Sequence, residues 1–245
     1  EIKLNKGLTL DVELREESES LEEVVVSAEA ANANVTNTEM SVAKLTPKEV
    51  EAVPVIFGEK DIIKMVQLLP GVKTSGEGGS GFSVRGGGLD QNLILLDEAP
   101  VYNASHLLGF FSVFNSDAIK DVTLYKGGMP AEYGGRASSV MDVIMKDGNS
   151  KRFGASGGIG LISSKLTLEA PIVKDKGSFI VSGRRTYADV FLKLSSNEDL
   201  NNTALYFYDL NLKANYQITD RDRIFISGYF GRDNFGFADE FGFNW

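Results

Sequence analysis

Strict alternation of apolar and polar side chains is the clearest pattern in the chain. Across residues 206–218 every second residue is apolar, and mostly polar or charged side chains stand between them. A period of two predicts a β-strand with one apolar face. A short polar turn at residues 219–222 leads into a second apolar series that includes Ile224, Ile226 and Phe230. These segments predict a hairpin of two long antiparallel strands.

The first of these strands is long enough to cross a lipid bilayer. At about 3.3 Å per residue, residues 206–218 reach about 43 Å, which exceeds a hydrocarbon core of about 30 Å even when the strand is tilted. Tyrosines near both ends stand where membrane barrels carry aromatic girdles. A short turn on one side and a longer polar loop at residues 195–202 on the other match the loop asymmetry of outer-membrane barrels.

Two further strands precede this hairpin. One is expected over residues 153–170 with a bulge near Ile162, and another begins at Phe179 and is interrupted at Arg184 and Arg185. This gives four strands by residue 237. Because four strands cannot close and an open edge facing lipid is not tolerated, we expect the front portion of a larger barrel.

Shorter strands joined by glycine-rich turns fill the middle of the chain. Residues 82–84 alternate before Arg85 and three glycines, so a strand carries one cation to a flexible turn. Four apolar residues, 93–96, end at Asp97, which indicates a buried strand stopped by a turn. Two more apolar strands are expected over residues 119–125 and 140–146.

Helix signals come before these strands. Thr46 and Glu49 form a capping box with proline at the first helical position, and the helix that they begin must end at Pro54. A second helix is expected over residues 59–69, stopped by proline and glycine. The Gly- and Ser-rich loop at residues 73–81 precedes a strand, which argues against a phosphate-binding loop.

These motifs, taken in order, resemble the plug domain of TonB-dependent outer-membrane receptors. The matching features are a Val-Arg-Gly strand end at residues 84–86, Leu-Asp-x-x-Pro at 96–100, and Lys-Gly-Gly to Ala-Glu-Tyr-Gly at 126–134 before an apolar strand. The resemblance implies an α+β plug, with a small mixed sheet and short helices, over residues 44–148. The start of a transmembrane antiparallel β-barrel would follow over residues 149–245.

The resemblance also explains the N-terminal region. Residues 2–14 alternate, and residues 1–17 resemble the tail of a carboxypeptidase-regulatory-like β-sandwich extension, while residues 18–43 form a linker. Within the linker, an unpartnered β-branched run resembles the TonB box, an extended peptide that adds a strand to the periplasmic domain of TonB. The alternative is an ordinary strand of the plug or of the upstream domain. The residues assigned to TonB binding are Glu22, Glu23, Val24, Val25, Val26 and Ser27.

Site residues follow from the same resemblance. Contacts between plug and barrel are expected at Arg85, Asp97 and Arg136, with Arg85 paired to acidic residues of the barrel wall or making a plain structural ion pair. A plug loop with Tyr102, Asn103 and His106 at its tip is expected to face incoming ligand. The alternatives are that this loop closes the core and that His106 is a hydrogen-bonded structural side chain.

Composition excludes several other functions. The net charge of −9 argues against nucleic-acid binding. With no cysteine and one histidine, thiolate and multi-histidine metal sites are excluded, and no cofactor is expected. Carboxylates occur without a matching base or nucleophile, so we expect no enzyme.

The function implied by the resemblance is TonB-dependent active transport of a ligand across the outer membrane. The plug gates the barrel and lies with the N-terminal extension on the periplasmic side. Expected partners are the periplasmic domain of TonB, outer-membrane lipid and an imported ligand of unknown class. Whether a surface lipoprotein is a further partner stays open. The alternative is a soluble β-rich binding or adhesion module, in which the apolar face of residues 206–218 would pack in a protein core.

Overall fold

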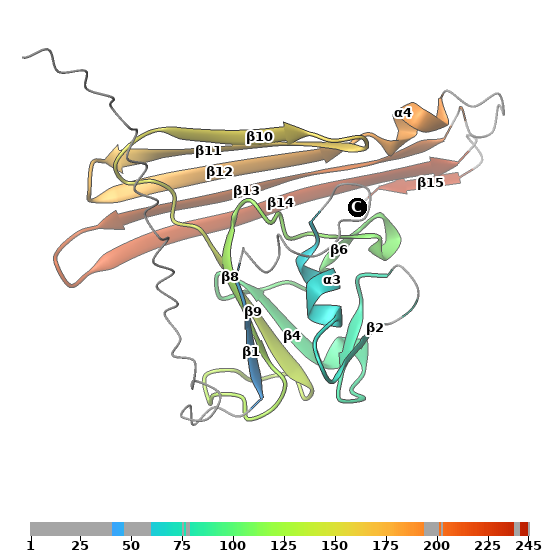
Figure 1. Cartoon of the computed structure of the whole chain (residues 1–245), viewed down its shortest axis with the longest axis horizontal. Helices are drawn as coiled ribbons and strands as arrows, with labels where there is room; N and C mark the ends of the chain where they lie inside the picture. The colour runs from blue at the N-terminus through green and yellow to red at the C-terminus, as the bar shows by residue number, and fades with distance from the viewer. Residues whose placement is uncertain are drawn as a thin grey trace, which may run out of the picture. The chain divides into compact units, whose positions relative to one another are not determined.

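The computed structural model describes residues 41–46, 60–74, 76, 79–193, 201, 203–237 and 241–244. All of these belong to the unit Glu39–Trp245. The expected sandwich tail at residues 1–17, the TonB-box segment and the helix that the capping box begins lie outside the described residues. Figure 1 shows the two main groups of strands, which we call the small sheet and the long sheet.

The small sheet is mixed, as the resemblance implied. Its strand order is β1 (Val42–Leu45), β8 (Ile119–Tyr125), β9 (Ser139–Met145), β4 (Asn92–Leu96) and β5 (Ala99–Pro100). β4 and β9 pair in parallel, and the other neighbours pair antiparallel. Asp97 and Glu98 both have positive φ, 46° and 71°, and form the two-residue turn between β4 and β5. That turn brings the Asp97 carboxylate to the end of the sheet.

Among the described residues, one α-helix and two short hairpins accompany the small sheet. They are α3 (Ile62–Gln67), the pair β2 (Val72–Thr74) and β3 (Phe82–Val84), and the pair β6 (Ser105–His106) and β7 (Phe111–Ser112). The turns η1 (Leu89–Gln91) and η2 (Leu107–Gly109) are 3-10 helices. None of the helices in the described ranges is long and apolar enough to cross a membrane.

Helix α3 begins later than the sequence predicted. The side chain of Asp61 accepts hydrogen bonds from the backbone N–H groups of Ile63 and Lys64, at 2.8 and 3.3 Å. An N-cap of this kind satisfies free donors at the helix start and fixes the first turn. Ile63 and Val66 on this helix are fully buried in the core of the small sheet.

The long sheet is an antiparallel meander in which each strand pairs with the next in sequence. Its strands are β10 (Gly154–Ile159), β11 (Ser163–Val173), β12 (Gly177–Thr186), β13 (Ala204–Gln217), β14 (Arg223–Phe237) and β15 (Phe241–Asn244). A short helix, α4 (Ala188–Leu192), follows β12. The expected hairpin of β13 and β14 is confirmed, and its turn is closed by a hydrogen bond from Thr219 Oγ1 to Asp222 Oδ2.

Two predictions about the earlier strands were wrong. Residues 153–170 form two strands rather than one bulged strand, because the chain reverses where Gly160 N donates to Ser163 O at 2.7 Å. The described sheet therefore has five strands by residue 237 instead of four, and β15 adds a sixth after it. β12 also continues through both arginines, because Arg184 is ion-paired across to β13 while Arg185 lies on the opposite, exposed face.

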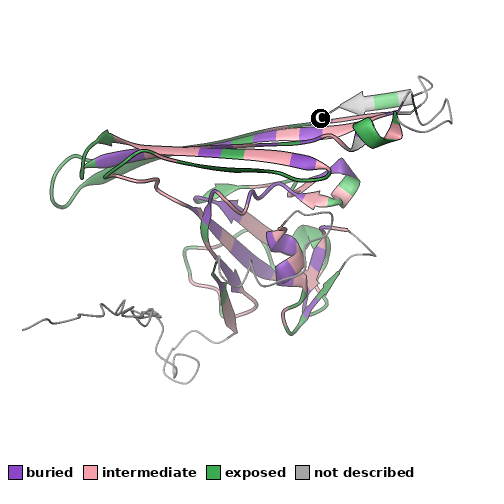
Figure 2. Ribbon diagram, turned by 45° about the horizontal axis from the view of Figure 1, so that its top comes forward, coloured by how far each residue is buried: buried purple, intermediate pink, exposed green. Residues whose placement is uncertain are grey.

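The two faces of β13 have the reverse burial of a soluble sheet. Asp209, Asn211, Lys213 and Asn215 are buried, whereas Leu210 and Leu212 on the other face are 45% and 42% exposed. Alternating burial along the long strands is visible in Figure 2. We call the face with the buried polar residues the inner face. The apolar face does not pack in a core formed by the described residues, contrary to what the soluble-module alternative predicted.

Candidate functional site

The inner face of the long sheet is joined to the loops of the small sheet by three groups of polar contacts. The first surrounds His106, the second joins residues 115–117 to β11 and β12, and the third surrounds Lys213. These contacts link residues far apart in sequence, and His106 and its partner Asp233 are separated by 127 positions. Together they form the candidate functional site.

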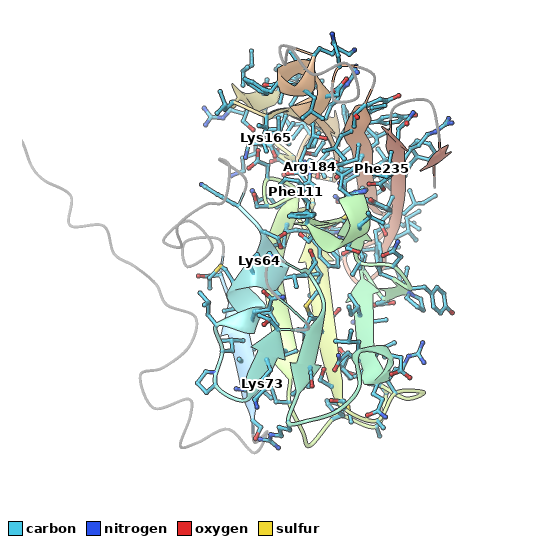
Figure 3. All side chains as sticks on the ribbon, turned by 90° about the vertical axis from the view of Figure 1, so that its right-hand side faces the viewer. Lys64, Lys73, Phe111, Lys165, Arg184 and Phe235 are labelled. Carbon is cyan, nitrogen blue, oxygen red and sulfur yellow. The ribbon has the colours of Figure 1, made fainter. Side chains whose placement is uncertain are left out.

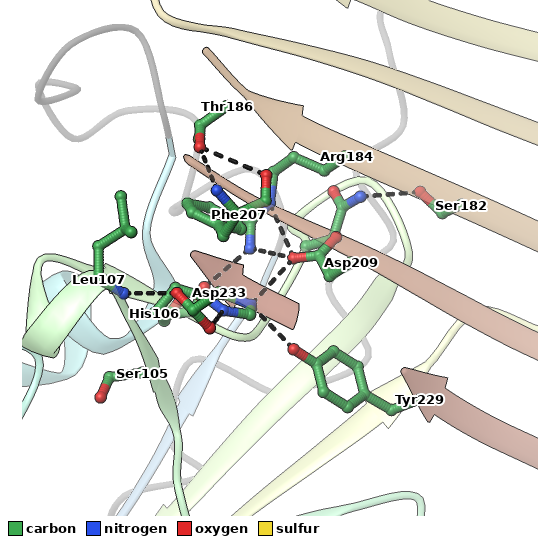
Figure 4. Close-up of polar contacts among 12 residues, drawn as sticks. Ser105, His106, Leu107, Ser182, Arg184, Thr186, Phe207, Asp209, Tyr229 and Asp233 are labelled. Carbon is green, nitrogen blue, oxygen red and sulfur yellow. Dashed lines mark hydrogen bonds and ion pairs between the residues drawn. The ribbon is translucent and has the colours of Figure 1, made fainter. Parts of the chain in front are cut away.

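His106 is held from three directions by the long sheet (Figure 4). Its Nδ1 lies 2.7 Å from Oδ2 of Asp233, and the other oxygen of this carboxylate accepts from Leu107 N at 2.7 Å. Its Nε2 lies 2.9 Å from the hydroxyl of Tyr229 and 3.4 Å from Oδ2 of Asp209. Since an ionised carboxylate only accepts, Nδ1 donates to Asp233. One carboxylate of β14 thus holds both the side chain and the backbone of this loop.

A stack of rings and a cation completes the group. The imidazole of His106 is parallel to the Phe207 ring, at a centroid distance of 4.1 Å and an angle of 8°. The guanidinium of Arg184 lies 4.9 Å from the centroid of the same ring, which is a cation–π contact. Arg184 also donates to Asp209 at 2.5 Å and to the carbonyl of Ser112 at 2.8 Å. The ring of Phe111 lies 5.5 Å from that of Phe207, and Figure 3 labels Phe111 and Arg184.

The charge environment favours the protonated form of His106. Burial alone disfavours imidazolium and lowers the pKa, but the hydrogen bonds and negative charges of Asp209 and Asp233 outweigh it and raise the pKa of His106 above its usual value. The contact between loop and sheet is therefore an ion pair below that raised pKa.

The loop after His106 has an unfavourable backbone conformation. Leu107, Leu108 and Gly109 have φ of 46°, 58° and 103°, and a left-handed conformation costs about 1–2 kcal/mol for each non-glycine residue. The carbonyl of Gly109 accepts from the backbone N of Ser80 at 2.6 Å and from its hydroxyl at 2.5 Å. The bonds to Asp233 and Ser80 therefore offset the cost of this loop.

The second group lies between residues 115–117 and the neighbouring strands β11 and β12. Asn115 Nδ2 donates to Ser182 Oγ at 2.9 Å, and both residues are buried. Lys165 Nζ lies 2.8 Å from Oδ1 of Asp117 in a pair that is about a quarter exposed. Partial exposure makes this ion pair weaker than the buried ones.

The third group centres on the ammonium of Lys213. Its Nζ lies 2.9 Å from Oδ1 of Asp97 and donates to the carbonyl of Met145 at 3.1 Å. A second carboxylate, Asp147, is 3.3 Å away and also pairs with Arg223 at 3.0 Å. The side chains of Lys213 and Asp97 are 7% and 2% exposed, so removing one would leave a buried, uncompensated charge.

A pocket of about 700 Å³ opens beside this group. Its lining includes Asp97, Lys213 and the half-buried carboxyl of Asp142, which accepts from the Tyr133 hydroxyl at 3.3 Å. Burial raises the pKa of Asp142, and the Tyr133 hydrogen bond offsets only part of that rise. Within the described ranges, no group of three or more histidine or acidic side chains is arranged to hold a metal ion.

The three residues predicted to join plug and barrel, Arg85, Asp97 and Arg136, do not form one cluster. Asp97 contacts Lys213 of the long sheet at the distance given above. Arg85 has a φ of 50°, lies at the turn after β3, and donates to Ser41 Oγ at 2.5 Å. Arg136 is exposed. The pairing of Arg85 and Arg136 with a barrel wall stays a prediction.

The predicted ligand-facing loop needs one correction. Tyr102 is 88% exposed, and Asn103 is also exposed, with its side-chain oxygen accepting from Ser105 N at 3.3 Å. His106 is only 2% exposed, so it is not at an exposed tip and is the hydrogen-bonded structural side chain of the alternative interpretation. His106 is buried because Phe207, Asp209 and Asp233 pack around it. Ligand contact by Tyr102 and Asn103 stays a prediction.

Sequence reasoning missed the partners on the long sheet. They are Arg184, Asp209, Lys213, Tyr229 and Asp233. Charged residues on the polar face of a strand whose other face is apolar were an available signal, because membrane strands bury that polar face inside a barrel. The sequence does not show which loop each residue meets.

Comparison with known proteins agrees with this arrangement. Residues 34–140 match the family model of the TonB-dependent Receptor Plug Domain. No curated protein sequence matches the chain. Among solved structures, the siderophore receptor PirA from Acinetobacter baumannii has 19% identity and a TM-score of 0.58, over 80% of this chain and 32% of its own.

Other solved structures give the same result. PirA from Pseudomonas aeruginosa has 18% identity and a TM-score of 0.58, over 81% of this chain and 35% of its own. The outer membrane transporter YddB from Escherichia coli has 16% identity and a TM-score of 0.57, over 80% and 33%. The chain thus spans about a third of the length of these structures. At sequence identities of 16–19%, the similarity to these structures establishes the fold alone.

Three findings together define the class of protein. They are the matched plug sequence, the small mixed sheet, and the long sheet whose polar face is buried and whose apolar face is exposed. Residues 34–140 form a TonB-dependent receptor plug domain, and the strands that follow have the fold of the start of such a receptor's β-barrel. This class contains receptors and transporters and not enzymes, which agrees with the sequence analysis. From here on the small sheet with its helix and hairpins is called the plug, and the long sheet is called the barrel wall.

Proposed function

We propose that this protein imports a ligand across the outer membrane by TonB-dependent active transport, with the plug gating the barrel. The observation that carries the proposal is the burial pattern of β13. Its polar face is buried against the plug, and its apolar face is exposed. Such a wall is stable where lipid covers the apolar face and a plug fills the interior.

Energy for transport would come through a partner. The segment with Val24, Val25 and Val26 is the proposed TonB box, to which the periplasmic domain of TonB adds as a strand. Pulling on this segment would reach the plug, whose loops are held to the wall by the groups around His106 and Lys213. The plug and the N-terminal extension would then lie on the periplasmic side, on the side of the short turn at residues 219–222.

The ligand would enter from the opposite side. Tyr102 is on an exposed plug loop and, with Asn103, is proposed to contact it. Arg85 and Arg136 are proposed to pair with acidic residues of the barrel, which would keep the resting plug in place. A surface lipoprotein is a further proposed partner, because receptors with this kind of extension include ones that use such a lid.

The test is capture of the whole protein, in detergent, by the immobilised periplasmic domain of TonB. Wild type should be retained and Val25→Pro should be lost, because proline removes a backbone donor and breaks strand addition. Val35→Pro, in the same linker but outside the proposed box, is the matched control and should bind like wild type.

Two results would contradict parts of the proposal. If wild type shows no binding to the TonB domain, the transport proposal fails. If Val25→Pro binds as well as wild type, the assignment of the box at residues 22–27 fails, and the import proposal would need another attachment segment.

A further inference from the structure

Two neighbouring loops at one end of the barrel wall carry a group of cations, at the left in Figure 1. One loop, residues 149–153, leads into β10, and the other, residues 174–176, joins β11 to β12. The backbone N–H of Asp175 donates to the carbonyl of Ser150 at 2.9 Å, so the two loops lie side by side. The cations, which we call the basic group, are Lys151, Arg152, Lys174 and Lys176.

The charge of the basic group is not neutralised by any described residue. All four side chains are exposed, and none of them forms an ion pair with the part of the chain that the structure describes. The two loops contain a single acidic residue, Asp175, which is also exposed and forms no ion pair with described residues. Four positive charges and one negative charge leave +3 on the two loops, although the whole chain carries −9.

Backbone contacts hold both loops in place. The side-chain oxygen of Asn149 accepts from the backbone N–H groups of Lys151 and Arg152, at 2.9 and 3.1 Å. The carbonyl of Lys176 accepts from the backbone N–H of Gln217, at the end of β13, at 2.8 Å. The backbone that carries the basic group is therefore fixed before a ligand binds, which lowers the entropy cost of binding.

An apolar band on the outer face of the barrel wall, the face opposite the plug, ends at the basic group. Residues in register on neighbouring antiparallel strands share a face. The last row before the turn of residues 174–176 is Val173, Gly177, Tyr216 and Ile224, and the next row inward is Ala170, Phe179, Ala214 and Ile226. Ile224 and Ile226 are 56% and 69% exposed. Phe153, which follows Arg152, is 66% exposed.

The length of β13 places the basic group at a membrane boundary. Ten positions separate Tyr206 from Tyr216 on the outer face, which is about 33 Å along the strand and about 25 Å along the barrel axis at a tilt near 40°. This is the height of the apolar band of outer-membrane barrels, which aromatic residues flank on both sides. Because the Tyr216 row is one border of the band, the adjoining turn of residues 174–176 lies at the level of the lipid head groups.

We propose that the basic group binds a phospholipid with a net negative head group, whose acyl chains cover Phe153 and the apolar rows. Lysine and arginine beside a membrane surface attract anionic lipids, and both donate charge-assisted hydrogen bonds to phosphate oxygens. A soluble anion would contact only the cations, whereas a lipid also covers the apolar side chains next to them. The lipid belongs to the leaflet on the side of the turn at residues 219–222. The inference rests on the proposed membrane location of this face.

The test is native mass spectrometry of the whole protein, purified in detergent and exposed to an equal mixture of phosphatidylglycerol, which is anionic, and phosphatidylethanolamine, which is zwitterionic. Wild type should retain phosphatidylglycerol in preference to phosphatidylethanolamine. Arg152→Gln/Lys174→Gln removes one cation from each loop and should lower the affinity for phosphatidylglycerol by about tenfold or more. Added inorganic phosphate should not displace the lipid.

Two control variants separate this site from effects of folding and of total charge. Arg152→Lys/Lys174→Arg keeps both positive charges and should retain phosphatidylglycerol like wild type. Lys73→Gln/Lys120→Gln removes two exposed lysines of the plug, and therefore the same total charge, and should also bind like wild type.

Four results would overturn the inference. The first two are equal retention of the two lipids by wild type and equal retention of phosphatidylglycerol by wild type and Arg152→Gln/Lys174→Gln. The others are displacement by inorganic phosphate and an equal loss of binding in Lys73→Gln/Lys120→Gln, which would show dependence on total charge alone. Failure of wild type to insert into lipid bilayers would instead contradict the proposed function.

Discussion

His106 Nδ1 and Asp233 Oδ2 lie 2.7 Å apart, and this contact joins a plug loop to the fifth strand of the described barrel wall. The neighbouring oxygen of Asp233 holds the backbone N–H of Leu107. The carboxylate therefore holds a loop in which two leucines have left-handed backbone conformations. The protonation state of the His106 imidazole therefore affects the stability of the contact between this plug loop and the barrel wall.

The attachment of this loop should depend on pH. Because the folded-state pKa of His106 is raised, its contribution to stability is complete below the unfolded value of about 6.5 and is lost as pH rises through the folded value. Wild type should therefore melt at a lower temperature as pH rises through this window. His106→Gln should show a smaller change, measured by thermal unfolding in detergent across that range. Equal slopes for the two proteins would show that His106 is not the titrating group.

The buried pair of Lys213 and Asp97 should give a strongly non-additive mutant cycle. Lys213→Met should lower the free energy of unfolding by about 3–5 kcal/mol because it leaves a buried carboxylate unpaired. Adding Asp97→Asn should recover much of this loss. The measurement is the denaturant midpoint of each variant. As a control, Lys120→Met breaks an exposed 4.0 Å pair with Asp121 and should lower the free energy of unfolding by less than about 1 kcal/mol. If the effects of Lys213→Met and Asp97→Asn were strictly additive, the two residues would not form a coupled buried ion pair.

A charge on the apolar face of β13 should destabilise the barrel according to its depth. Leu212 lies midway between Tyr208 and Tyr216 on that face, so Leu212→Arg should cost about 2–4 kcal/mol, as arginine does near a bilayer midplane. Gln217→Arg, at the exposed end of the strand, should be nearly neutral. Guanidinium unfolding in lipid vesicles measures both. Similar midpoints for the two variants would argue against lipid on this face.

Gly148 connects the plug to the barrel wall and should not tolerate a side chain. Its φ is +78°, and an added Cβ would lie 2.3 Å from the carbonyl oxygen of Phe179. Gly148→Ala should therefore lower the melting temperature more than Gly86→Ala, where φ is +84° but space is open. Gly134→Ala, which meets nothing within 4 Å, should be close to wild type. A reversed order would contradict this steric ranking.

Local patterns accounted for many of the elements. The strands over residues 82–84, 119–125 and 206–217 are where alternation or apolar runs predicted them, because a period of two fixes both the strand and its faces. The pattern does not predict the β10–β11 turn, because Leu161 and Ile162 are apolar and give no polar turn signal. Helix α3 begins at Ile62, later than predicted, because the Asp61 side chain caps the first turn.

The sequence alone determined that one face of the long strands is apolar and the other polar, since side-chain direction alternates with every residue. It also determined the order of the plug motifs. Only the tertiary structure decided that the polar face is the buried one and that His106 meets Asp233 and Asp97 meets Lys213. The reason is physical: these pairs are 127 and 116 positions apart, and no local period relates residues that meet only when a loop folds back against a sheet.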